Sequence, residues 1–74
     1  MPPLTHSQYE ILERAIARGS RIAVVHHGTE LVLLPERLRV VAGREALDAR
    51  HPSTGDRLTL VLDELEAVES VTAR

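Results

Sequence analysis

The chain has 74 residues, a formal net charge of −2 and no cysteine, and 43% of its residues are hydrophobic. This length favours a single domain, residues 1–74, with a small core, and a chain without cysteine can form neither disulfides nor thiolate zinc sites. The longest wholly apolar run, Leu31–Leu34, is far too short to span a membrane, so we expect a cytoplasmic protein without a membrane partner. The negative net charge also argues against the broad basic surface of a nucleic-acid-binding protein.

A helix is predicted over residues 5–18, after a loose leader at residues 1–4. Thr5 and Gln8 have the spacing of a capping box, and Gly19 follows the last expected helical residue. Apolar residues recur at helical spacing along one face: Ile11, Leu12, Ala15 and Ile16. This stripe predicts a helix that docks on the rest of the domain.

Short strands are predicted between residues 21 and 72. The first two, at 21–27 and 30–34, form a hairpin that turns at Gly28, and Pro35 ends the second of them. An alternating run at 38–42 predicts a third strand, and a turn at Gly43 leads into a fourth at 45–50.

The next segment, residues 57–65, carries leucines at alternating positions and predicts a central strand. The turn residues at 52–56 precede it, and a polar bend at 63–65 leads to a last strand. Strands joined by tight turns exclude a parallel sheet, which needs long crossovers. We therefore predict a mainly β fold with one N-terminal helix: a small antiparallel barrel of five to six strands, SH3-like or Sm-like.

The sequence shows no pattern typical of catalysis or of cofactor binding. Its serines lack a histidine and a carboxylate at a recognisable spacing, and the acidic residues Asp63, Glu64 and Glu66 fit a polar bend better than an acid/base pair. His26 and His27 are neighbours on a predicted strand, where successive side chains point to opposite faces. We therefore expect no catalytic residues, no cofactor and no metal site.

Arginine is the residue type that best suggests a ligand. The strand region contains six arginines and no lysine: Arg21, Arg37, Arg39, Arg44, Arg50 and Arg57. A guanidinium binds phosphate or carboxylate through two parallel hydrogen bonds. Arg37, Arg50 and Arg57 are the candidate contacts to a small anionic or nucleotide-like ligand, although the same arginines also fit a solvated surface.

From residue 12 onward the chain resembles the WYL-domain family. The matching pieces are residues 15–22, Leu34-Pro35 with Leu38, residues 43–49, and Thr54–Arg57 continuing to Asp63. Glu45-Ala46-Leu47 stands where the family has Trp-Tyr-Leu, and Arg57 alone remains basic after the Thr-Gly turn. The resemblance implies an Sm-like barrel in a bacterial regulatory protein that binds nucleotide or nucleic-acid ligands, with most of the family's ligand positions missing.

Two functions remain open at this point. One is a non-enzymatic regulatory or ligand-sensing module, and the other is a protein-interaction or oligomerisation module without a small ligand. Exposed apolar positions on the strands, Val32, Val41 and Val61, predict a homodimer or another homo-oligomer, since soluble monomers rarely expose large apolar patches. Single-stranded nucleic acid is disfavoured as a partner, because Tyr9 is the only aromatic side chain of the Phe, Trp and Tyr class on which a base could stack.

Overall fold

A computed structural model describes residues 4–71 of the protein. Residues 1–3 of the predicted leader and residue 72 of the predicted strand region lie outside the described residues. Within the described range, no helix is long and apolar enough to cross a membrane.

The predicted helix is confirmed as α1 (His6–Arg18). The hydroxyl of Thr5 accepts a hydrogen bond from the Gln8 N–H at 3.1 Å, and the Gln8 side chain accepts one from the Thr5 N–H at 2.9 Å. Gly19 ends the helix in the left-handed region at φ 68°, which only glycine adopts without a steric cost. Local capping chemistry therefore determines both ends of α1.

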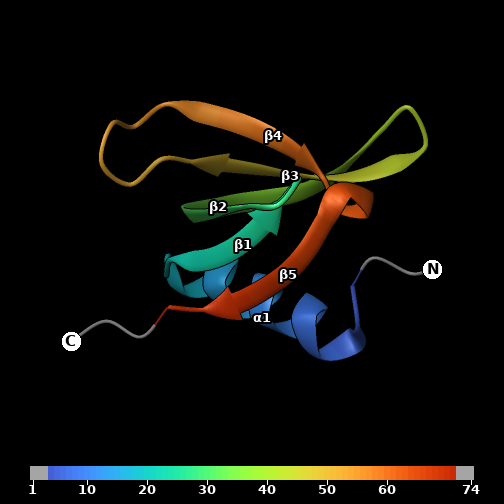
Figure 1. Ribbon diagram of the computed structural model, residues 1–74, viewed down its shortest axis with the longest axis horizontal. Coiled ribbons are helices and arrows are strands. Elements are labelled where there is room, and N and C mark those ends of the chain that lie inside the picture. The colour runs from blue at the N-terminus through green and yellow to red at the C-terminus, as the bar shows by residue number, and fades with distance from the viewer. Residues whose placement is uncertain (1–3, 72–74) are drawn as a thin grey trace.

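The strands form one antiparallel sheet in the order β4-β3-β2-β1-β5 (Figure 1). Their bounds are β1 (Ile22–His26), β2 (Thr29–Val41), β3 (Arg44–Arg50), β4 (Arg57–Val61) and β5 (Leu65–Ser70). A 3₁₀ turn, η1 (Leu62–Glu64), joins β4 at one edge of the sheet to β5 at the other. The sheet curls on itself, as a small barrel-like domain requires, so the predicted mainly β antiparallel fold is confirmed.

The prediction that Pro35 ends a strand is wrong. β2 continues through Pro35, and the segments predicted at 30–34 and 38–42 are one bent strand with a register shift between Pro35 and Arg37. The pairing of β2 with β1 ends at Leu33, opposite Ile22, so the missing N–H of Pro35 breaks no hydrogen bond to β1. The bulge bends β2 where it exchanges β1 for β3 as its partner.

The leucine-rich segment is also placed differently from the prediction. β4 is an edge strand, paired with β3 alone, and not a central strand. Its inner face is nevertheless buried, because the curled sheet encloses Leu60 and the following Leu62. Alternation in sequence thus identified the buried face of β4 but not its neighbours.

The core lies inside the curled sheet, and α1 packs against β5 and β2 on its open side. Every element contributes a buried aliphatic side chain: Leu12, Ala15, Ile22, Val24, Leu33, Leu47, Ala49, Leu60, Leu62, Leu65 and Val68. Aliphatic packing of this kind leaves the outer face of β2, β3 and β4 free for polar side chains.

Candidate functional site

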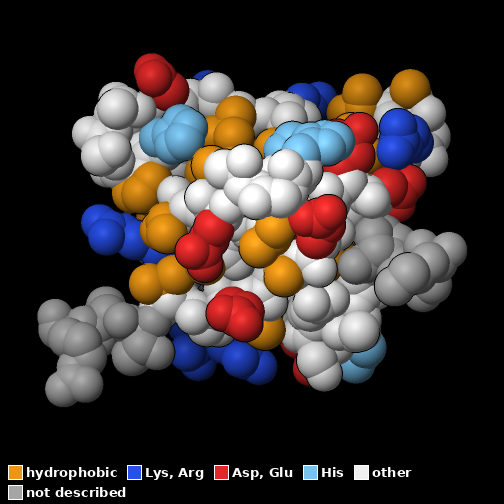
Figure 2. All heavy atoms as spheres, viewed as in Figure 1, with side chains coloured by type: hydrophobic (Ala, Val, Ile, Leu, Met, Phe, Trp, Pro, Cys, Tyr) orange, Lys and Arg blue, Asp and Glu red, His pale blue; other side chains and the backbone are white. Residues whose placement is uncertain are grey.

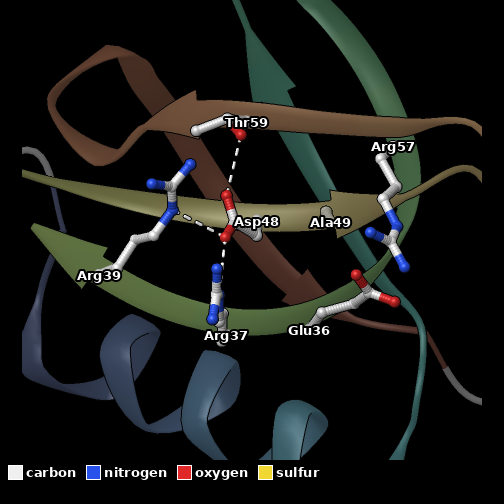
Figure 3. A pocket seen from close by; sticks show the side chains of 7 residues that line it. All are labelled: Glu36, Arg37, Arg39, Asp48, Ala49, Arg57 and Thr59. Atoms are coloured by element: carbon white, nitrogen blue, oxygen red, sulfur yellow. Dashed lines mark hydrogen bonds and ion pairs between the residues drawn. The ribbon is translucent and has the colours of Figure 1, made fainter. Parts of the chain in front are cut away.

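A pocket of about 490 Å³ opens on the outer face of β2, β3 and β4 (Figure 3). Its lining consists of Glu36, Arg37, Arg39, Asp48, Ala49, Arg57 and Thr59. The register explains why these residues meet, because Asp48 on the middle strand β3 lies opposite Arg37 on β2 and opposite Thr59 on β4. Cross-strand neighbours on one face of a sheet are close enough to bond directly.

Asp48 is the centre of the polar contacts in this pocket. Its Oδ2 accepts from the Nε of Arg37 at 2.9 Å and lies 2.7 Å from the Nε of Arg39, while its Oδ1 accepts from the hydroxyl of Thr59 at 2.8 Å. The hydrogen bond from Arg37, followed by the one from Thr59, lowers the pKa of Asp48 from 3.8 to about 2. Asp48 is therefore a carboxylate throughout the physiological pH range and orients both arginines.

The other end of the pocket is formed by Arg57 and Glu36, as Figure 3 shows. Within residues 4–71 no carboxylate oxygen lies within 4.0 Å of the Arg57 guanidinium, so it has no ion-pair partner there. Three arginines and two acids thus surround one opening, and an anion placed between them would meet an excess of positive charge.

The structure separates the three arginines that the sequence proposed. Arg37 and Arg57 both line the pocket, whereas Arg50 is absent from the lining and its Nη2 lies 2.9 Å from Glu36 Oε2. The sequence analysis missed Arg39, Asp48 and Thr59 as members of the site. The spacing of Arg37 and Arg39 by two residues on a strand was the available signal, but the opposing Asp48 required the register.

The three valines proposed for an interface do not form one patch. Val32 lies in the part of β2 that pairs with β1, while Val41 lies at the far end of the same strand, beyond the bulge. Val61 on β4 is only partly exposed. Val40, which the sequence analysis did not single out, has the highest exposed fraction of these valines, at 68%. The exposed fraction of Val32 and of Val41 is 42%.

A second polar cluster lies where the β1–β2 turn meets η1, and here the sequence argument about the histidines was wrong. The His26 and His27 rings meet edge to face, with centroids 4.1 Å apart and an interplanar angle of 76°, and do not point to opposite faces. The Nε2 atoms of both rings lie close to Glu64 Oε1, at 3.4 and 3.6 Å. The hydrogen bond from His26 is the main cause that lowers the pKa of Glu64.

The comparisons with known proteins bear on the fold. No protein-family model and no curated protein sequence matches the chain. Among solved structures, the chain is similar to proteasome accessory factor B/C (PafBC) of Arthrobacter aurescens, with a TM-score of 0.74 and 20% sequence identity. The similarity covers 90% of this chain and 12% of that one. At this identity the likeness shows the fold alone, and that fold is compatible with the WYL-like barrel that the sequence suggested.

Proposed function

We propose that this chain is a non-enzymatic regulatory or ligand-sensing module that binds a small anionic or nucleotide-like ligand in the pocket around Asp48. The observation that carries the proposal is the arrangement of Arg37, Arg39 and Arg57 around one opening on the sheet. Guanidinium groups are the side chains best suited to bind phosphate and carboxylate oxygens.

Asp48 prepares the pocket for binding and does not neutralise it. Arg37 and Arg39 contact Asp48 through their Nε atoms, so the terminal nitrogens of both guanidiniums remain to meet a ligand. An arginine that is already oriented loses less conformational freedom on binding, which favours affinity.

The same geometry argues against acid/base chemistry in this pocket. A general base works best when its pKa is near the operating pH. The pKa of Asp48 is lowered to about 2, so its carboxylate is far too weak a base. The hydroxyl of Thr59 is already committed to Asp48. These groups are equipped to hold a ligand and not to transfer a proton.

The size and lining of the pocket support a small ligand that is held through its anionic groups. Small-molecule sites measure roughly 300–1,000 Å³, a range that includes this pocket of about 490 Å³. Its lining contains no aromatic side chain, so a nucleotide would be held through its phosphates and not by stacking of its base. This lining disfavours nucleic acid as the partner.

The WYL resemblance and the fold similarity support a regulatory role. The solved structure with the similar fold is named as an accessory factor of the proteasome, and this chain corresponds to 12% of its length. A small domain of this kind is well suited to sense a ligand on behalf of a larger protein or complex.

The test is calorimetric titration of the protein with inorganic pyrophosphate and with a nucleoside diphosphate. We expect Arg57→Gln to weaken binding by more than about tenfold, because it removes a charge-assisted contact. Asp48→Asn should also weaken binding, because an amide offers a single acceptor oxygen and can no longer orient both arginines while it bonds Thr59.

Arg21→Gln is the matched control, since Arg21 is exposed and lines a different, smaller pocket beside α1. Its binding should equal that of the unmodified protein. Loss of binding in Arg21→Gln, with Arg57→Gln unaffected, would place the ligand elsewhere and refute this proposal. Failure of both compounds to bind would refute it as well.

Self-association is a second candidate function, favoured by the exposure of Val40 and Val41 at the end of β2. Figure 2 shows hydrophobic side chains on the surface at the tip of the β2–β3 hairpin. These side chains are not part of the core cluster. A homodimer that covers this tip would remove apolar surface from water.

Light scattering decides this second candidate. We expect a mass near twice the monomer mass of 8.2 kDa. Val41→Lys should return the protein to the monomer mass. Thr29→Lys, at another exposed position of β2, is the control and should remain dimeric. A monomer mass for the unmodified protein at micromolar concentrations would exclude self-association.

A further inference from the structure

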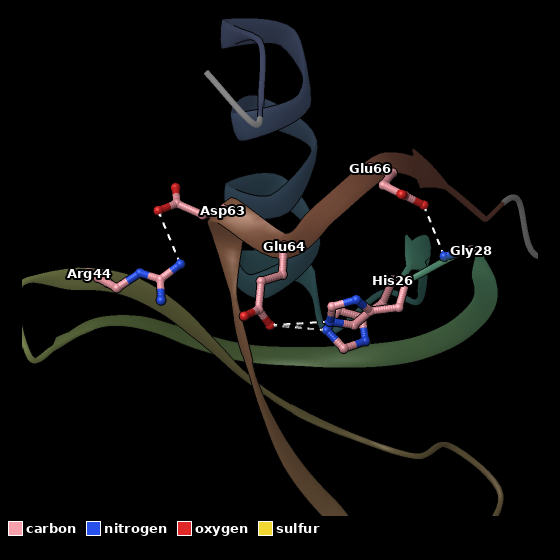
Figure 4. A network of polar contacts seen from close by, with 7 residues as sticks. His26, Gly28, Arg44, Asp63, Glu64 and Glu66 are labelled. Atoms are coloured by element: carbon pink, nitrogen blue, oxygen red, sulfur yellow. Dashed lines mark hydrogen bonds and ion pairs between the residues drawn. The ribbon is translucent and has the colours of Figure 1, made fainter. Parts of the chain in front are cut away.

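His26, His27 and Glu64 form a compact group of potential metal ligands that the pocket around Asp48 does not use (Figure 4). One ligand atom from each residue can be chosen so that all three lie within 4.8 Å of one another. Figure 2 shows histidine side chains next to acidic side chains on the face in view. Two imidazoles and a carboxylate converge here from segments 38 residues apart in the sequence.

The β1–β2 turn brings the two histidines together. β1 ends at His26, and His27 and Gly28 occupy a two-residue turn with φ angles of 52° and 77°. Positive φ at both positions is typical of the type I′ turn that closes a tight hairpin. The chain direction changes at His27, and strand alternation therefore no longer determines where its ring points.

Contacts from the other end of the chain hold this turn in place. The N–H of Gly28 donates to Glu66 Oε1 at 3.0 Å, which links the turn to β5. A register shift between Val25 and His26 also re-aims the end of β1 against β5. Supporting contacts of this kind keep ligand side chains oriented in metal sites.

Glu64 is held equally well on the opposite side. It ends η1, and Leu62, the first residue of that turn, and Leu65, the residue after it, are 3% and 2% exposed. The neighbouring Asp63 pairs with Arg44 at 3.4 Å, directed away from the histidines in Figure 4. The Glu64 carboxylate thus extends from a rigid support toward the two rings.

The separations fit the ligand sphere of a small transition metal ion. Zinc bonds of about 2.0–2.1 Å place neighbouring ligands of a tetrahedron about 3.3–3.4 Å apart. The distances from Glu64 Oε1 to His26 Nε2 and His27 Nε2 are 3.4 and 3.6 Å. An ion could therefore enter with small side-chain movements.

The ligand types favour zinc over calcium or magnesium. Imidazole suits zinc, nickel and copper, whereas calcium and magnesium prefer oxygen ligands. Two histidines and one glutamate are also a set that leaves the fourth position of a zinc ion open to water or another ligand.

We propose that His26, His27 and Glu64 bind one divalent transition metal ion, with zinc as the first candidate, at the junction of the β1–β2 turn and η1. This proposal departs from the sequence-based expectation of no metal site. The site is independent of the anion pocket, which uses the outer face of β2, β3 and β4.

The test is calorimetric titration of the full chain, freed of metal with a chelator, with zinc chloride. We expect saturable binding of one ion per chain. His27→Gln and Glu64→Gln should each weaken binding by more than about tenfold, because even residues that merely support a ligand contribute that much. Cobalt(II) bound in place of zinc should show the visible absorption of a low-coordinate site, which both variants should lose.

His51→Gln is the control, since His51 lies in the β3–β4 turn and is absent from the cluster. It should bind zinc like the unmodified protein. His27 is 67% exposed, so its replacement should leave the thermal unfolding curve of the metal-free chain unchanged. The proposal is overturned if no saturable binding is seen, if His27→Gln binds normally, or if His51→Gln loses binding as well.

Discussion

Replacement of Leu12 by alanine should destabilise the protein by about 2–5 kcal/mol, the usual cost of a leucine-sized cavity in a core. Leu12 is fully buried and belongs to the core cluster, where α1 meets β5 and β2. A domain of this length has a total stability of roughly 4–11 kcal/mol, so the substitution removes a large share of it. The melting temperature should fall by about 4–8 °C for each kcal/mol lost.

Glu13→Ala is the matched control for the helix. Glu13 is exposed on α1, so the change should alter stability by no more than about 0.5 kcal/mol. Circular dichroism during heating and urea titration measures both variants. An unchanged melting temperature for Leu12→Ala would show that α1 contributes nothing to the core.

A chain that ends at Glu64, and therefore lacks β5, should not fold. β5 supplies Leu65 and Val68, both about 2% exposed, and it pairs with β1 from Ile22 opposite Ser70 to His26 opposite Leu65. Without β5, the backbone N–H and C=O groups along one edge of β1 have no partner strand. The helix α1 also loses one of the two strands on which it packs. A domain this small has no second core to compensate for the loss.

The shortened chain should give a circular dichroism spectrum without β structure and no cooperative melting transition. A chain that ends at Val71 is the control, because it keeps every described strand and should melt like the full chain. Cooperative melting of the chain that ends at Glu64 would show that β1 to β4 and the helix suffice for folding.

Local signals account for what could be predicted from the sequence. Thr5, Gln8 and Gly19 determine the ends of α1 through bonds between residues three or four apart. The turns at Gly28, Gly43 and Gly55 were recognisable because tight turns often need positive φ, which glycine adopts readily. In the structure these glycines have φ angles between 77° and 80°. The antiparallel arrangement followed from these short connections, since tight turns leave no other pairing.

Distant partners account for what could not be predicted. From the sequence, Pro35 was predicted to end a strand, and only the structure shows that the pairing with β1 has already ended at Leu33. Arg50 was predicted to contact a ligand, but in the structure it forms an ion pair with Glu36. In the same way, the alternation of leucines in β4 gives its buried face but does not reveal that β4 has only one neighbouring strand.

The two polar sites show the same division most clearly. The sequence by itself determined that Arg39 lies on a strand and that a hairpin turns at Gly28, because both follow from the pattern of neighbouring residues. Only the tertiary structure decided that Asp48 lies between Arg37 and Thr59 of the two neighbouring strands and that Glu64 lies beside both histidines. Register and the closure of the sheet set those contacts, and both depend on how the whole core packs, which no short stretch of residues specifies.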